Sequence, residues 1–224
     1  MIITIDGPTA SGKSTIARTL AEELHFYYVS SGILFRAVAY ALLQDGHTYS
    51  EFATLTTKDI KNYLHELSYH YSADEKEQVL LANKNITLHL KTPEIDRGAS
   101  IVALNRNVRK LLLMLQQKIA HEHNVVVEGR DSGSVVFAHA DIKFFVTASE
   151  HERARRWQAD QKKKGNAFTL KKSVQEIKER DMRDATREIA PLIIPKDAIC
   201  IDTTDMALQD VIVLMLAIIK ENKI

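Results

Sequence analysis

A glycine-rich segment near the beginning of the chain contains the residue types that bind a phosphate chain. It reads Gly7-Pro-Thr-Ala-Ser-Gly-Lys13-Ser14 and matches the pattern G-x-x-x-x-G-K-[ST] at every fixed position. Glycine lets the backbone approach a phosphate closely, and the helix expected after this loop supplies unpaired N–H groups and a favourable dipole. Lys13 would place a positive charge near the β- and γ-phosphates, and the Ser14 hydroxyl can bind Mg²⁺. The segment therefore predicts a phosphate-binding loop of the kind that holds nucleoside triphosphates.

Arginine residues recur at positions where later strands are expected to end. In a parallel sheet, ligands bind beyond the carboxyl ends of the strands. The arginines and their neighbouring acids are Arg36, Arg130, Asp131, Arg180, Asp181, Arg183, Asp184 and Arg187. Guanidinium groups hold a phosphate in a fixed orientation, and a carboxylate accepts hydrogen bonds from sugar hydroxyls. The set indicates a second, phosphorylated ligand, although each arginine taken singly is more often a solvated residue or half of a surface ion pair.

Short apolar strands alternate with amphipathic helices along most of the chain, which predicts a parallel sheet covered by helices. Strands are expected at residues 2–6, 26–29, 125–127, 142–146 and 198–202, and helices at residues 14–24, 32–43, 57–67, 93–104, 108–121, 150–164, 171–184 and 206–220. The segments 69–72, 78–81 and 86–90 alternate between polar and apolar residues. They predict a small antiparallel insertion that contains a hairpin.

The composition is that of an ordinary globular protein. The chain has 224 residues, of which 45% are apolar, and its 30 Lys and Arg against 29 Asp and Glu give a formal charge of +1. A near-neutral chain without an aromatic-rich recognition module is not expected to bind nucleic acid. The charge is unevenly distributed, however, because residues 150–190 hold 12 basic and 8 acidic side chains while the rest of the chain holds 18 and 21. The excess positive charge therefore lies in one segment.

Membrane association and disulfide bonds are not expected. The longest apolar run, residues 211–219, is far shorter than the ~20 residues that span a bilayer, and no signal peptide is visible. Cys200 is the single cysteine, so no internal disulfide can form, and its apolar strand predicts a buried thiol. A cytoplasmic protein that acts as a monomer is expected.

Taken together, the motifs resemble those of the bacterial cytidylate kinase family. The resemblance rests on Gly7-Pro-Thr-Ala-Ser-Gly-Lys-Ser-Thr15, Ser31-Gly32 with Arg36, Glu128-Gly-Arg-Asp-Ser-Gly-Ser-Val-Val136, Glu179-Arg-Asp-Met-Arg-Asp-Ala-Thr-Arg187, and Ala190-Pro191-Leu192. Their order and spacing agree from the first strand to the last helix. Many families share the phosphate-binding loop, whereas the two segments that contain Arg-Asp pairs are much more specific. Glu128 stands where an Asp is common in the family.

The resemblance implies the α/β fold of the P-loop nucleoside monophosphate kinases. That fold has a central five-stranded parallel sheet flanked by helices, a small antiparallel strand insertion and a helical lid. Residues 1–224 would form a single P-loop kinase domain. Its core would comprise residues 1–30, 105–149 and 190–224, its monophosphate-binding region residues 31–104, and its lid residues 150–189.

The resemblance also implies an activity, which is the ATP-dependent phosphorylation of CMP and dCMP to CDP and dCDP with Mg²⁺. ATP would bind to Gly7, Pro8, Thr9, Ala10, Ser11, Gly12, Lys13, Ser14 and Thr15, with Ser14 as the metal ligand. The monophosphate would bind to Ser31, Arg36, Ser100, Arg109, Arg130, Asp131, Arg180, Asp184 and Arg187. The catalytic residues would be Lys13, Arg130, Arg153, Arg183 and Arg187.

Two alternative functions stay open at this point. One is a nucleoside monophosphate kinase that prefers UMP or AMP. The other is a P-loop switch that binds a nucleoside triphosphate without transferring phosphate. The second set of arginines disfavours the switch, because a switch needs no cradle for a second phosphate. The acceptor oxygen of a monophosphate is already ionised at neutral pH, so no catalytic histidine or serine is expected in the kinase.

Overall fold

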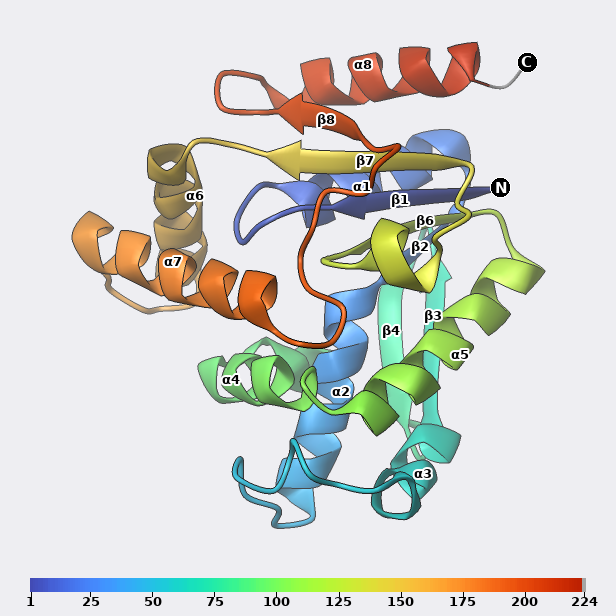
Figure 1. Ribbon diagram of the computed structural model, residues 1–224, viewed down its shortest axis with the longest axis vertical. Helices are drawn as coiled ribbons and strands as arrows, with labels where there is room; N and C mark the ends of the chain where they lie inside the picture. The colour runs from blue at the N-terminus through green and yellow to red at the C-terminus, as the bar shows by residue number, and fades with distance from the viewer. Residues whose placement is uncertain (223–224) are drawn as a thin grey trace. The chain divides into compact units, whose positions relative to one another are not determined.

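The computed structural model describes residues 1–222, which form two compact units (Figure 1). Among these residues, the first unit consists of 1–26 and 126–222, and the second of 27–125. None of the helices in the described part of the chain is long and apolar enough to cross a membrane. The predicted division into a core, a monophosphate-binding region and a lid stays a prediction.

The first unit contains the predicted phosphate-binding loop and most of the central sheet. Its elements are β1 (Ile2–Asp6), α1 (Lys13–Leu24), β6 (Val125–Gly129), a π-helical turn (Ser132–Val136), β7 (Ile142–Thr147), α6 (Glu150–Lys163), α7 (Leu170–Thr186), β8 (Ile199–Asp202) and α8 (Leu208–Glu221). The three strands β1, β6 and β7 are apolar and almost wholly buried. Such strands are typical of a parallel sheet that is covered on both faces.

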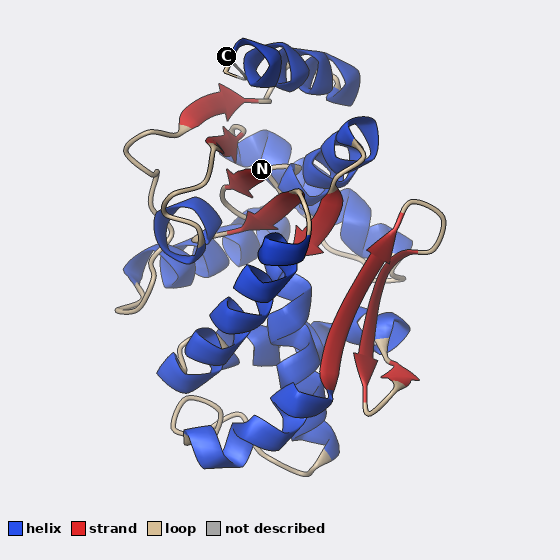
Figure 2. Ribbon diagram, turned by 90° about the vertical axis from the view of Figure 1, so that its right-hand side faces the viewer, coloured by secondary structure: helices blue, strands red, loops and turns tan. Residues whose placement is uncertain are grey.

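The second unit is mainly helical and carries a small antiparallel sheet (Figure 2). Its elements are β2 (Tyr27–Ser30), α2 (Ser31–Gln44), α3 (Thr57–Glu66), β3 (Leu67–Ser72), β4 (Lys76–Leu81), β5 (Lys84–Asn85), a 3-10 helix (Thr87–Lys91), α4 (Pro93–Val102) and α5 (Arg106–Glu122). Helices α2 and α4 approach closely at Gly98, where a Cβ would lie 3.0 Å from that of Ala39 and 3.2 Å from the ring of Phe52. A small residue is therefore needed at this crossing.

The central sheet has five strands in the order β2-β6-β1-β7-β8. Strands β1 and β7 are parallel, with Ile3 opposite Ile142, and β7 and β8 are parallel, with Phe144 opposite Ile199. Strands β3, β4 and β5 form the separate three-stranded sheet. These sheets confirm the predicted α/β fold with a five-stranded parallel sheet and an antiparallel strand insertion.

Two predictions about local structure were wrong. Residues 86–90 are not a strand, because Val79 N–H donates to the Thr87 side chain at 2.8 Å, which ends the backbone ladder soon after Ile86. The hairpin itself is confirmed, and its turn uses positive φ angles at Ala82 and Asn83. Cys200 is exposed rather than buried, because β8 lies at the edge of the sheet and Ile201 is the neighbour that faces the core.

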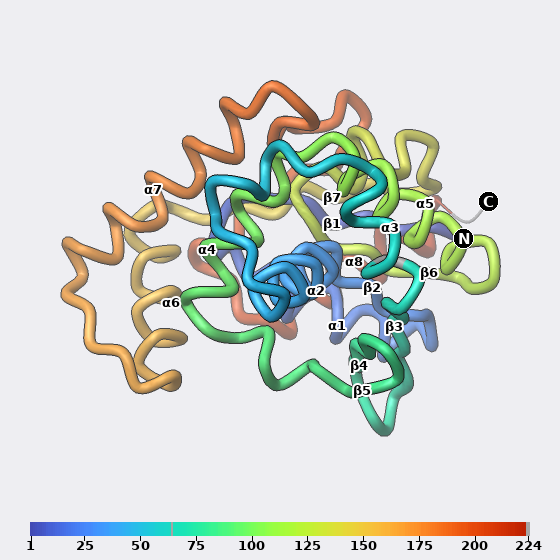
Figure 3. The backbone as a smooth tube through the Cα atoms, turned by 90° about the horizontal axis from the view of Figure 1, so that it is seen from below, coloured from blue at the N-terminus to red at the C-terminus, as the bar shows by residue number. Residues whose placement is uncertain are grey.

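Helices α6 and α7 form the two arms of a helical hairpin (Figure 3). The Trp157 and Phe168 rings pack edge to face with their centroids 4.9 Å apart, and Gln158 donates to the Phe168 carbonyl at 2.6 Å. Near the other end of the hairpin, Lys178 pairs with Glu150 at 3.2 Å. The helices predicted for the lid segment are therefore confirmed and pack against each other.

Candidate active site

The phosphate-binding loop joins β1 to α1, as the motif requires. Only glycine fits at position 7, because a Cβ there would lie 2.0 Å from the Val146 carbonyl oxygen. Gly12 adopts a left-handed φ of 92° immediately before the helix, which glycine does without strain. Helix α1 begins at Lys13, and the N–H groups of its first turn have no partners within the helix. The loop therefore offers an anion-binding helix terminus.

Carbonyl groups of the same loop accept hydrogen bonds from three cationic side chains. These bonds join Lys13 Nζ to Pro8 (3.0 Å), Arg153 Nη1 to Thr9 (2.9 Å) and Arg156 Nη1 to Ser11 (3.2 Å). They fix the shape of the loop and gather positive charge around it. The two arginines belong to α6, so this helix is attached directly to the phosphate-binding loop.

The environment of Lys13 disfavours its positive charge. The side chain is only 5% exposed, and burial lowers the pKa of its amine to about 7, with a further contribution from the neighbouring Arg130. Glu128 acts in the opposite direction and favours the charged amine. A bound phosphate chain would bring negative charge to this position and restore the ordinary protonated state of the lysine.

We therefore expect ATP binding to take up a proton in mildly alkaline solution. Above pH 7 much of the Lys13 amine is neutral in the free protein, whereas bound phosphates favour the charged form, so the affinity for ATP should fall as the pH rises from about 7 to 9. Calorimetry in two buffers with different ionisation enthalpies measures the proton uptake. The Lys13→Met variant lacks this amine and should show no such proton uptake. Equal proton uptake by the two proteins would contradict the attribution of the uptake to Lys13.

Arginine and carboxylate side chains form a second cluster in the first unit. Arg130 donates through Nε to Asp184 at 2.8 Å, and Arg187 donates through Nη2 to Asp131 at 2.9 Å. Burial alone would raise the pKa of Asp184, but Arg130 and Arg180 outweigh it and hold that pKa below its usual value. Each carboxylate thus faces a guanidinium group. The cluster brings together five predicted substrate residues, which are Arg130, Asp131, Arg180, Asp184 and Arg187.

One predicted catalytic arginine lies apart from this cluster. Arg183 is exposed on α7, and its Nε donates to the Glu179 carbonyl of the same helix at 3.3 Å. Its catalytic role stays a prediction. Asp181, which had no predicted role, instead contacts the phosphate-binding loop and pairs with Arg153. The alternation of Arg and Asp along α7 was visible in the sequence, but it does not indicate which of these residues faces the loop.

A buried carboxylate holds the turn that carries Arg130 and Asp131. Asp6, at the end of β1, accepts hydrogen bonds from the N–H groups of Ser132 at 2.9 Å and Gly133 at 2.7 Å. Burial raises the pKa of Asp6 to about 6, while these two N–H groups act to lower it. The end of β1 therefore positions both the phosphate-binding loop and the turn that follows β6.

Gly133 is packed too tightly in this turn to accept a side chain. A Cβ would lie 2.6 Å from Thr4 Oγ1 and 3.3 Å from Lys143 Cδ, so we expect Gly133→Ala to lower the free energy of unfolding by about 2 kcal/mol. Gly32→Ala is the matched control, because a Cβ there would meet nothing within 4 Å beyond its chain neighbours and the backbone of its own helix, and alanine suits the α2 helix. Urea unfolding measures both variants, and equal stability would contradict the predicted clash.

The remaining predicted substrate residues lie in the second unit. Arg36 on α2 pairs with Asp96 on α4 at 2.5 Å, and Ser100 lies one helical turn after Asp96. Ser31 is buried at the beginning of α2. Arg109 on α5 donates to the Ala103 carbonyl at 3.1 Å, and its guanidinium lies 5.3 Å from the centre of the Phe35 ring. Within this unit, the Arg36–Asp96 pair therefore joins α2 to α4.

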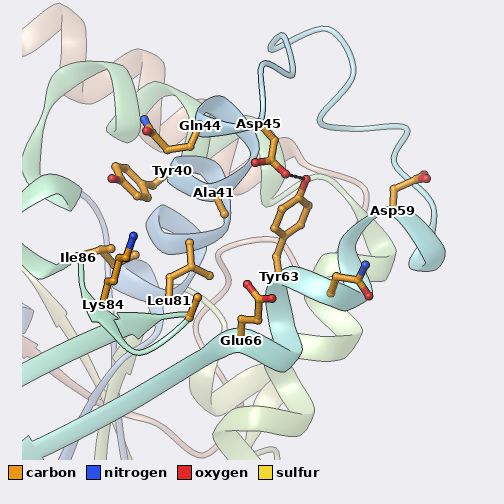
Figure 4. A pocket seen from close by; sticks show the side chains of 12 residues that line it. Tyr40, Ala41, Gln44, Asp45, Asp59, Tyr63, Glu66, Leu81, Lys84 and Ile86 are labelled. Atoms are coloured by element: carbon orange, nitrogen blue, oxygen red, sulfur yellow. Dashed lines mark hydrogen bonds between the residues drawn. The ribbon is translucent and has the colours of Figure 1, made fainter.

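A pocket of about 480 Å³ also opens in the second unit (Figure 4). Its lining includes the carboxylates of Asp45, Asp59 and Glu66, and Tyr63 donates a hydrogen bond to Asp45. Burial raises the pKa of Tyr63 to about 12, helped by that bond to Asp45. None of the predicted site residues lines this pocket. Its three carboxylates disfavour a nucleotide phosphate by like-charge repulsion.

Comparison with known proteins finds similarity to one family along nearly the whole chain. The family model described as cytidylate kinase matches residues 3–221. A cytidylate kinase from Carboxydothermus hydrogenoformans is 38% identical over 220 residues, which cover 98% of this chain and 97% of that protein. A cytidylate kinase from Listeria monocytogenes is 38% identical over 222 residues, with the same coverage of 98% and 97%.

A solved structure with little sequence similarity shares the fold. It is that of an uncharacterized protein from Eubacterium ventriosum, which is 15% identical, with a TM-score of 0.51 and coverage of 98% of both chains. At this identity the likeness concerns the fold alone.

Proposed function

Because this chain belongs to the cytidylate kinase family, we propose that it transfers the γ-phosphoryl group of ATP to CMP and dCMP, forming CDP and dCDP. One contact in the first unit carries the proposal. Arg130, which is predicted to bind the acceptor phosphate, donates to Thr9 of the phosphate-binding loop at 3.3 Å and to Asp184 at 2.8 Å. Arg130, a predicted ligand of CMP, therefore contacts the loop that is predicted to bind ATP.

The charged residues of the first unit would exchange partners when substrates bind. Asp184 holds the guanidinium group of Arg130, and Asp131 holds that of Arg187. The two arginine side chains therefore lose little conformational entropy when a phosphate binds. We assign Arg130 and Arg187 to the CMP phosphate, Asp131 to the cytosine edge, and Asp184 with Arg180 to the ribose. The family resemblance adds Ser31, Arg36, Ser100 and Arg109 as residues of the same substrate.

The chemical step needs no general base. The attacking oxygen of CMP is ionised at neutral pH, so the chain has to orient two polyanions and offset their charge. Lys13 supplies positive charge from within the loop, and Arg130 and Arg153 supply it from the adjoining elements. Residues 150–189, closing over the nucleotides, would exclude the water that otherwise accepts the phosphoryl group.

The residues of the loop fit a magnesium ion that arrives with the nucleotide. Mg²⁺ keeps several waters and takes few protein ligands when phosphates bind it, and Ser14 offers an exposed hydroxyl in the first turn of α1. Across residues 1–222, no group of three or more His, Cys, Asp or Glu side chains is placed to hold a metal ion by itself. We propose Ser14 as the protein ligand. When bound, Mg²⁺ would neutralise charge on the β- and γ-phosphate oxygens.

Discrimination between nucleobases would come from hydrogen bonding. Cytosine presents an amino donor beside two acceptors, which a carboxylate or hydroxyl and an arginine complement. Uracil presents an acceptor and an N–H at the corresponding positions and would leave polar groups of the pocket unpaired, a mismatch that discriminates strongly. We therefore propose Asp131, Ser100 and Arg109 as the residues that favour CMP over UMP.

Initial rates of ATP consumption with single monophosphates test the proposed function. With CMP, dCMP, UMP, AMP and GMP supplied separately, we expect CMP and dCMP to give the highest kcat/KM. A higher kcat/KM with UMP or AMP would identify that nucleotide, and not CMP, as the preferred substrate. Binding of ATP without transfer to any monophosphate would favour the P-loop switch. The expectations of a cytoplasmic location and a monomeric state stay predictions.

A further inference from the structure

Thr9 of the phosphate-binding loop is bound by three side chains from three different elements. Its N–H donates to Asp181 Oδ1 on α7 at 2.8 Å, its carbonyl accepts from Arg153 on α6 at 2.9 Å, and its hydroxyl accepts from Arg130 after β6 at 3.3 Å. All three polar groups of this one residue are thus used. Asp181 is the one of the three partners to which neither the motif nor the proposed mechanism gives a role.

Asp181 differs from the ordinary surface acids of the α6–α7 hairpin. It pairs with Arg153, and the two side chains are only 19% and 12% exposed. The other ion pair between these helices, Lys178 with Glu150, has side chains that are 58% and 46% exposed. Exposed pairs contribute little to stability, whereas a pair shielded from water holds its partners in a fixed orientation. The Asp181 carboxylate is therefore placed to fix both the Arg153 guanidinium and the Thr9 N–H.

The charges around the loop give this carboxylate a further effect. Lys13, Arg130 and Arg153 all approach the same few residues of the loop. Asp181 brings the negative charge that keeps the Arg153 guanidinium beside the Thr9 carbonyl. Without it, Arg153 would keep only its bonds to the Ala148 and Thr9 carbonyls, at 3.2 and 2.9 Å, against repulsion from the neighbouring cations.

We propose that Asp181 is a positioning residue for phosphoryl transfer, which holds Thr9 and Arg153 in a fixed relation and so docks α7 on the phosphate-binding loop. The inference rests on the proposed function, in which Arg153 neutralises the transferring phosphoryl group. Asp181 contacts no substrate in this account. It acts through Arg153 and through the Thr9 backbone.

The Asp181→Asn variant tests the proposal, since it keeps the size of the side chain and an oxygen for the Thr9 N–H but loses the charge that holds Arg153. We expect kcat for CDP formation to fall about tenfold while the KM for CMP changes less than about twofold. We also expect a larger fraction of the ATP consumed to be lost as free phosphate, because an undocked α7 admits water. Loss of stability alone would not change this partition between transfer and hydrolysis.

A double-mutant cycle with Arg153→Gln tests whether Asp181 acts through Arg153. The double variant should lose no more activity than the more impaired single variant, because the two residues work as one unit. Glu176→Gln is the matched control, since it neutralises an acid on the same helix that pairs with the surface residue Lys172. Its kcat and its hydrolysis fraction should equal those of the unmodified protein.

Three results would overturn the proposal. They are an Asp181→Asn variant with unchanged kcat and unchanged partition, losses that multiply independently in the double variant, and a change confined to the KM for CMP. If Asp181→Asn lowers the Tm strongly, Asp181→Glu decides the question, because it keeps the charge. Recovery of both Tm and kcat supports the proposal, and recovery of Tm without kcat contradicts it. Failure of the proposed function would be distinct, since the unmodified protein would then form no CDP.

Discussion

Lys13→Met is expected to lower kcat for CDP formation by about 10³-fold and to leave the protein folded. The lysine supplies positive charge inside a buried loop, where charge stabilisation of a transferring phosphoryl group contributes most. Burial lowers the pKa of Lys13 to about 7, so the charged amine that is present at and below this pH destabilises the folded protein. Methionine has a similar length and no charge. The Tm of the variant should therefore equal or exceed that of the unmodified protein.

Single-turnover kinetics and thermal unfolding measure the two effects of this substitution. Lys172→Met is the control, because Lys172 is an exposed residue of α7 whose partner is the surface acid Glu176. It should alter neither kcat nor Tm. If Lys13→Met retained more than about a tenth of the activity, Lys13 would not be the principal source of charge in the loop.

Arg187→Ala is expected to lower kcat/KM for CMP by about 10² to 10³-fold while the affinity for ATP changes little. Its guanidinium is only 5% exposed, lies 2.9 Å from Asp131 and donates through Nε to the Ala190 carbonyl at 2.6 Å. Removing it eliminates a proposed phosphate ligand and leaves a buried carboxylate without this cation. Breaking such a pair costs about 3–5 kcal/mol, so the Tm should fall as well.

Arg187→Lys separates the loss of binding from the loss of stability. Lysine keeps the positive charge next to Asp131 but cannot present two parallel N–H donors to a phosphate. We expect a Tm near that of the unmodified protein and a KM for CMP that is still raised at least about tenfold. Arg106→Ala, at an exposed position at the beginning of α5, is the control and should change neither value. Unchanged turnover of CMP by Arg187→Ala would refute the role of Arg187.

The parts of the fold that depend on local sequence patterns were predicted well. The phosphate-binding loop has its glycines because the backbone at Gly7 meets β7 and Gly12 adopts a left-handed φ, and both demands are visible as a motif. The buried strands β1, β6 and β7 consist mostly of Ile, Val and Phe, which makes them recognisable without their neighbours. The two polar helices predicted at residues 150–164 and 171–184 are also confirmed, as α6 and α7.

The features that were missed depend on contacts between residues far apart in the chain. Asp6 holds the turn at Ser132 and Gly133, and Asp181 binds Thr9, yet nothing near either acid in the sequence indicates its partner. The strand predicted at residues 86–90 failed for a more local reason, because the Thr87 side chain takes the place of a backbone acceptor for Val79 N–H. Sequence patterns identify candidate residues, whereas the tertiary structure decides which of them meet.

A competition experiment tests the central claim, which is that the chain phosphorylates CMP and dCMP in preference to other nucleotides. Equal concentrations of CMP, dCMP, UMP, AMP and GMP are mixed with limiting ATP that is labelled in its γ-phosphoryl group, and the labelled products are separated by chromatography. We predict that most of the label appears in CDP and dCDP. Label found mainly in UDP or ADP, or released mainly as free phosphate, would contradict the account.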